Sequence, residues 1–140
     1  MAFRFIVSLL VVLAPAAVSA AEDPVAEAQK IISDQIAALM AGNGALAYAL
    51  ASPGIRGTFP SEDKFLEMVR KQYEPLSHPA HYAFGRSKTV GGGELVLQEV
   101  IVNRHDAKDW SAIYEMRLQD DGSYKVNGVR VLAKTSSTGI

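Results

Sequence analysis

The 140-residue chain contains no cysteine, and this absence removes several kinds of chemistry at once. Without thiols there is no disulfide, thiolate zinc site, iron–sulfur cluster or cysteine nucleophile. A lipid anchor on a cysteine is excluded for the same reason. A chain of this length buries enough apolar surface to fold without such staples. The sequence therefore predicts an ordinary hydrophobic core, with no cofactor.

A surplus of charge of one sign is also lacking, because the chain has 14 Lys and Arg residues and 15 Asp and Glu residues. The basic residues are scattered along the chain, and Arg70 and Lys71 are the one adjacent pair. Binding to nucleic-acid phosphates normally requires a basic face. We therefore expect no nucleic-acid partner.

Long hydrophobic runs are absent, apart from about ten residues at Phe5–Ala14, which Pro15 ends. A membrane-spanning helix needs roughly 20 apolar residues. Arg4 precedes the run, and Val18 and Ala20 are small enough for a cleavage site before Ala21. The pattern predicts a cleaved signal over 1–20 rather than a retained anchor. We then expect a single domain over 21–140, with its core at about 24–134, located in the periplasm without a membrane anchor (or secreted, if the source lacks an outer membrane).

Helical spacing marks the first half of the remaining chain. Asp23 and Pro24 are typical of a helix start, and glycines at 42 and 44 are typical of its end. A second helix is predicted over 45–51, before Pro53, and a third between Ser61 and Pro75. The first helix has one stripe that we expect to be buried, formed by Val25, Ala28, Ile32, Ile36, Leu39 and Met40.

Four strands are predicted in the second half, over 82–90, 94–103, 110–119 and 124–133. On the first strand, Tyr82, Phe84, Arg86, Lys88 and Val90 alternate with small residues. In the last strand the apolar alternation changes phase, and a bulge at Gly128 would reconcile its two halves. Helices followed by strands in hairpin order predict an α+β fold, with three N-terminal helices packed on a curved four-stranded antiparallel sheet.

Several runs of the chain are similar to a known bacterial family. They are QIAALMAGNGALAYALASPGIRGTF, FLEMVRKQYEPL, VLQEVIV and DWSAIYEMRLQDDGSYKVNGVRVL, between about Ile31 and Leu132. In these runs the chain resembles the family called domain of unknown function 4864. The resemblance implies a cone of the nuclear transport factor 2-like, or cystatin-like, kind in an exported bacterial protein. It implies no activity, because related cones include isomerases, dehydratases, hydrolases and binding modules.

Two polar residues on neighbouring strands are candidates for a ligand pocket. Gln98 shares the strand face of Val96, Val100 and Val102, so it is predicted to point toward the helices. A buried amide needs partners, which could be a ligand or protein groups such as Tyr114. Both readings stay open, with a structural hydrogen bond favoured.

Three aromatic residues are further pocket candidates. Trp110, Tyr82 and Phe84 could line the mouth of a cone beside Tyr114. They could equally be ordinary core residues, and the core reading is favoured.

Charged and imidazole side chains offer weaker candidates. His78 and His81 have a metal-binding spacing, but Pro79 makes a helix unfavourable between them, so we predict no metal site. Asp34 is considered as a catalytic carboxylate and Arg56 as a partner for an anion, and solvent exposure is favoured for both. No catalytic residue is assigned.

The function hypothesis follows from the lack of an acid/base pair among the positions predicted to face inward. The leading hypothesis is a noncatalytic binding or accessory module, holding a small apolar ligand or a partner protein. The alternative is a small enzyme of the isomerase or dehydratase type, which would need an ionisable pocket group beside a donor such as Tyr114. Self-association through Ile101 and Ile113 is a third possibility, and the oligomeric state is left open.

Overall fold

A computed structural model describes residues 23–105 and 109–135 of the chain, so the predicted signal over 1–20 lies outside the described residues. Helices come first: α1 (Pro24–Met40), α2 (Gly44–Ala49), α3 (Pro53–Thr58), α4 (Glu62–Gln72) and α5 (Glu74–Ser77). Strands follow: β1 (His81–Val90), β2 (Leu95–Asn103), β3 (Asp109–Leu118) and β4 (Tyr124–Thr135).

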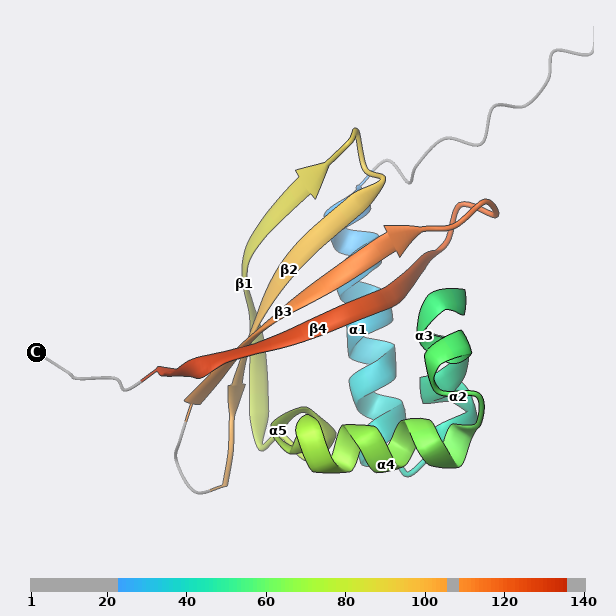
Figure 1. The fold of residues 1–140 in the computed structure, drawn as a ribbon. Coiled ribbons are helices and arrows are strands. Elements are labelled where there is room, and N and C mark those ends of the chain that lie inside the picture. Colours follow the sequence, from blue (N-terminus) through green and yellow to red (C-terminus); the bar gives the residue numbers. More distant parts are fainter. Residues whose placement is uncertain (1–22, 106–108, 136–140) are drawn as a thin grey trace, which may run out of the picture.

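The four strands form an open antiparallel sheet in the order β1-β2-β3-β4, with the helices on one face (Figure 1). The opposite face is open, since Ile101 and Leu132 are each 40% exposed. The predicted α+β class and antiparallel sheet are confirmed. None of the described helices is long and apolar enough to cross a membrane.

The start of α1 is confirmed, because the Asp23 carboxylate accepts from the Ala26 amide at 3.1 Å and Pro24 is the first helical residue. Ala28, Ile32 and Ile36 are fully buried along the predicted stripe. Met40 departs from the prediction. It is the last residue of α1 and is 51% exposed, because the buried stripe ends before the helix does.

The prediction of three helices is wrong, because the described chain has five. Pro53 and Pro75 were interpreted as helix breakers, but each lies in the first turn of a short helix instead. Proline loses little there, because the first-turn amides have no partner within the helix. The second helix consequently ends at Ala49 rather than at 51, and Ala51 instead pairs with Val126 in an isolated parallel bridge.

The sheet has three register shifts: one on β1 and two where β3 pairs with β4, near Gly128 and between Asp109 and Ser111. On β4 one residue is inserted, because Gly128 pairs with Glu115 while Val126 pairs with Met116, which confirms the bulge predicted from the phase change. The shift on β1, between Phe84 and Ser87, was not predicted. It corrects the alternation on β1: Lys88 and Val90 pair with the outward-facing Leu97 and Leu95, whereas Tyr82 and Phe84 pack on the inner side.

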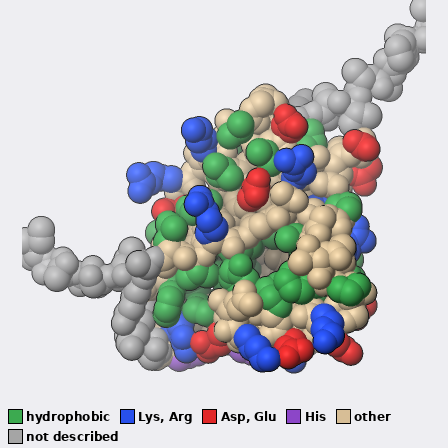
Figure 2. All heavy atoms as spheres, viewed as in Figure 1, with side chains coloured by type: hydrophobic (Ala, Val, Ile, Leu, Met, Phe, Trp, Pro, Cys, Tyr) green, Lys and Arg blue, Asp and Glu red, His purple; other side chains and the backbone are tan. Residues whose placement is uncertain are grey.

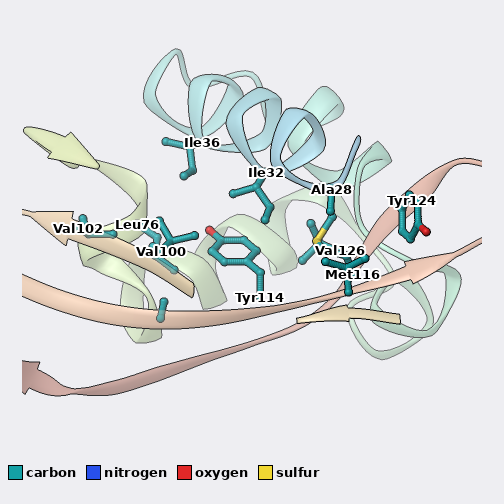
Figure 3. Close-up of a cluster of buried hydrophobic side chains, with 12 residues drawn as sticks. Ala28, Ile32, Ile36, Leu76, Val100, Val102, Tyr114, Met116, Tyr124 and Val126 are labelled. Atoms are coloured by element: carbon teal, nitrogen blue, oxygen red, sulfur yellow. The ribbon is translucent and has the colours of Figure 1, made fainter. Parts of the chain in front are cut away.

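The core consists of two clusters. The sheet cluster lies between α1, α5 and the inner face of the sheet, and Figure 3 shows its side chains meeting there. It comprises Ala28, Ile32, Ile36, Leu76, Val96, Val100, Val102, Ala112, Tyr114, Met116, Tyr124 and Val126. The helix cluster joins α1 to α2 and α4 and comprises Ala38, Ala47, Ala51, Phe65 and Val69.

Candidate functional site

A cavity of about 200 Å³ lies at the junction of the two clusters. Its helical walls come from α1, α3, α4 and α5, and include Leu39, Ile55, Phe59, Phe65, Met68 and Leu76. Its sheet wall comes from β3 and β4, with Tyr114, Val126, Gly128 and Val129. Figure 2 shows a hollow bordered by apolar side chains, below β4 and beside α3 and α4.

One wall of the cavity is held against β4 by a short bridge. The Ser52 amide donates to the Val126 carbonyl at 2.8 Å, and the Val126 amide donates to the Leu50 carbonyl at 2.9 Å. The Ser52 hydroxyl also donates to Asn127 Oδ1 at 2.8 Å and caps α3 by accepting from the Ile55 amide at 3.3 Å. The bulged segment of β4 is thus the part that positions α3.

The far end of α3 is fixed by Tyr48 of α2. Its hydroxyl contacts the Phe59 carbonyl at 2.6 Å and the Arg56 carbonyl at 3.1 Å. Carbonyl oxygens only accept, so the one hydroxyl proton is shared between them or directed at the nearer one. Both ends of this six-residue helix are therefore tied down, which holds Ile55 and Phe59 at the cavity.

The lining of the cavity contains no Asp, Glu, His, Lys or Arg side chain among the described residues. Its polar groups are few. Gln35 is buried and donates from Nε2 to the Ala47 carbonyl at 3.1 Å, which directs its Oε1 away from that carbonyl. Gln72 is exposed, and Tyr73 is half-buried. The cavity is therefore apolar and uncharged, with a small number of fixed polar atoms.

Tyr114 is the most deeply buried polar side chain of the cavity, with 1% of its surface exposed. Its ring stands on β3 and points toward the helix layer (Figure 3). Its hydroxyl makes no hydrogen bond to another described residue, but it is not one of the fully buried atoms without a partner, which in the described part of the chain are Arg56 Nε and Trp110 Nε1. Burial raises the pKa of Tyr114, and the nearby Tyr82 adds a smaller effect in the same direction. The phenol is therefore a neutral O–H group that lacks a protein partner.

Gln98 lies directly opposite Tyr114 on β2 but outside the cavity lining. It is fully buried, as its strand pattern predicted. Its Oε1 accepts from Gln29 Nε2 at 3.1 Å, and its Nε2 contacts the Gly85, Arg86 and Glu99 carbonyls at 3.3, 3.3 and 2.8 Å. These bonds tie the irregular part of β1 to β2 and α1.

The three aromatic candidates lie on the inner side of the sheet, where Trp110, Tyr82 and Phe84 pack against the sheet cluster. Tyr82 and Phe84 meet edge to face, with ring centroids 5.9 Å apart. None of the three lines the cavity. The structure thus brings Tyr114 to the cavity and leaves the other four candidate residues beside it.

The remaining candidates are dispersed. His78 and His81 are both exposed, and no three metal-ligating side chains converge within the described part of the chain. Asp34 pairs with Lys30 at 2.9 Å on the surface of α1. Arg56 is half-buried, and its Nε is buried without a hydrogen-bond partner.

Sequence reasoning missed the lining residues Gln35, Ile55 and Phe59. Ile55 and Phe59 were missed because α3 was not predicted. The signal that could have found the helix is the capping pair Ser52-Pro53, with Ile55 and Phe59 one turn apart on the same face. Gln35 carries no such signal, since its burial depends on the helices that pack around α1.

These features define a small α+β domain with a partly open apolar cavity between its helices and its sheet. The model of the family described as domain of unknown function (DUF4864) matches residues 21–139. The chain belongs to this family. No curated protein and no solved structure shows a significant match to the chain.

Proposed function

We propose that the protein is a noncatalytic binding module that holds a small, largely apolar molecule in the cavity between the two clusters. The observation that carries this proposal is the apolar cavity with Tyr114 in its wall, a residue whose hydroxyl makes no hydrogen bond to another described residue. Such a hydroxyl can donate to a molecule bound in the cavity.

Binding is favoured over acid–base catalysis by the chemistry of the lining. A general base or acid must exchange a proton near neutral pH. Burial raises the pKa of Tyr114, so this phenol keeps its proton, and no carboxylate or imidazole lines the cavity among the described residues. An isomerase or dehydratase would need such a group beside the hydroxyl.

The cavity volume sets the scale of the molecule. An engineered cavity of about 150 Å³ binds benzene, whereas drug-sized pockets have volumes of roughly 300–1,000 Å³. A cavity of about 200 Å³ therefore suits a compact molecule a little larger than benzene. The apolar walls favour its transfer from water.

Two further features belong to this proposal. The hydrophobic run and the small residues at 5–20 support export to the periplasm. The mass of the N-terminal peptide of the purified protein tests this proposal, since cleavage of the signal would make that peptide start at Ala21. The register shifts on β1 and β4 support a cone of the nuclear transport factor 2-like kind. An experimental structure that superposes on such cones would establish that fold, and a flat sheet would contradict it.

Native mass spectrometry of the protein, purified from its own cell envelope, tests the binding function. We expect the protein to carry a bound small molecule, seen as an added mass that disappears after extraction with an organic solvent. Val129→Phe places a ring in the sheet wall of the cavity and should abolish the retained mass. Leu132→Phe is the matched control: it lies on the same strand but is exposed, and it should keep the retained mass.

Identical retention by the two variants would contradict binding in this cavity. A bare protein mass in every preparation, followed by failure of small apolar probes to bind, would contradict the proposed function as a whole.

A further inference from the structure

We infer that the molecule held in this cavity is uncharged and carries a carbonyl oxygen that accepts a hydrogen bond from the Tyr114 hydroxyl. This inference rests on the proposed binding function and specifies its ligand class. It uses three observations: the apolar lining, the unpaired phenol, and the place of Gln35 in the same wall.

The uncharged character follows from what surrounds the cavity. An ion that leaves water for an apolar site loses several kcal/mol of hydration unless a counter-charge replaces it. The described lining offers no cation for a carboxylate or phosphate and no anion for an amine. Arg56 does not change this, because it is absent from the lining, although it lies on α3 between Ile55 and Phe59.

The carbonyl follows from the state of Tyr114. The Tyr114 hydroxyl makes no hydrogen bond within the described protein, so a ligand oxygen in the cavity can accept from it and add a net stabilising hydrogen bond. Because the phenol remains protonated, it is a donor, and a carbonyl is a good acceptor that needs no proton of its own. Gln35 uses one of its two amide N–H donors on the Ala47 carbonyl, which fixes its side chain in the same wall.

A cycle of two probes and one substitution tests the inference on the purified full chain. The probes are acetophenone, which has a carbonyl, and ethylbenzene, a hydrocarbon of nearly the same shape. Dissociation constants come from NMR titration of wild-type protein and of Tyr114→Phe. We expect the substitution to weaken the binding of acetophenone about fivefold, as the loss of one net hydrogen bond implies. The dissociation constant of ethylbenzene should change by less than about twofold.

Benzoate at pH 7 is the charged member of the set. We expect it to bind at least about tenfold more weakly than acetophenone, since it presents a similar ring but a full charge. Benzoate binding as tight as that of acetophenone would overturn the uncharged assignment.

The outcomes separate this inference from the proposed function. If both neutral probes bind and Tyr114→Phe lowers the affinity for each by the same factor, the carbonyl contact is overturned and cavity binding remains intact. Failure of both probes to bind folded wild-type protein would overturn the binding function itself.

A measurement on wild-type protein alone makes the test independent of the variant. Acetophenone labelled with ¹³C at the carbonyl should show a downfield carbonyl shift when bound, relative to its value in a hydrocarbon solvent. A bound carbonyl with the hydrocarbon value would overturn the contact with Tyr114.

Discussion

Gln98 on β2 and Tyr114 on β3 face each other across the inner side of the sheet, and both are almost completely buried. Gln98 contacts one side chain and three backbone carbonyls. Tyr114 has no hydrogen-bond partner for its hydroxyl among the described residues. Gln98 lies where α1 packs directly on the sheet, whereas Tyr114 borders the cavity that separates the sheet from α3 and α4.

The contrast between these two residues separates a structural polar group from a binding group. A buried amide whose hydrogen bonds are all made within the protein has a structural role, because its donors and acceptor are already occupied. A buried hydroxyl at a cavity wall has kept its capacity for a partner. Tyr124 sharpens the contrast, because its hydroxyl is also buried on the inner face but donates to the Gly93 carbonyl at 2.5 Å.

The largest effect is expected for Gln98→Leu. Leucine keeps much of the volume but leaves Gln29 and several carbonyls of the irregular β1 segment without their partner. We expect a loss of about 2–3 kcal/mol in the free energy of unfolding, measured by urea denaturation with Trp110 fluorescence. A loss below about 0.5 kcal/mol would mean that these bonds contribute nothing net.

Tyr124→Phe should have the next largest effect. It removes the hydroxyl bonded to Gly93 and leaves a buried carbonyl unpaired, so we expect a loss of about 1.5 kcal/mol in unfolding free energy. Tyr114→Phe is its matched control and should be neutral or stabilising in the absence of ligand, because no bond is lost. Equal losses of unfolding free energy in the two variants would contradict the distinction between the bonded hydroxyl of Tyr124 and the unbonded hydroxyl of Tyr114.

Alkaline pH should distinguish the wild type from Tyr114→Phe. An unfolded tyrosine ionises near its ordinary pKa of 10.0, whereas burial raises the pKa of folded Tyr114. Above pH 10 the folded state therefore binds more protons than the unfolded state, so the unfolding free energy falls as pH rises. Between pH 9.5 and 10.5 this one group accounts for a fall of about 0.7 kcal/mol. Urea titrations at both pH values should show that difference in slope, and parallel slopes would contradict the burial of the phenol.

Asp34→Asn should have the smallest effect. The carboxylate is exposed and pairs only with Lys30, one turn earlier on α1. We expect no measurable change in the melting temperature or in probe binding, because exposed pairs of this kind contribute little. A loss of probe binding would instead place Asp34 in the site and revive the carboxylate hypothesis.

Local patterns in the sequence predicted most of the fold. Asp23 and Ser61 mark the starts of α1 and α4, because their side chains accept from first-turn amides. The phase change around Gly128 located the bulge on β4, and the alternation on β2 placed Gln98 inward. Each depends on residues only a few positions apart, which is why sequence alone was sufficient.

Local sequence patterns thus sufficed for the order of helices before strands, the antiparallel sheet and the inward face of β2, but not for α3 and α5. Only the tertiary structure decided that Gln98 is satisfied by Gln29 and by the carbonyls of β1, while Tyr114 borders a cavity completed by Ile55 and Phe59. Those partners lie far away along the chain. Whether a buried polar group finds a partner depends on how the elements pack, and no local pattern records that geometry.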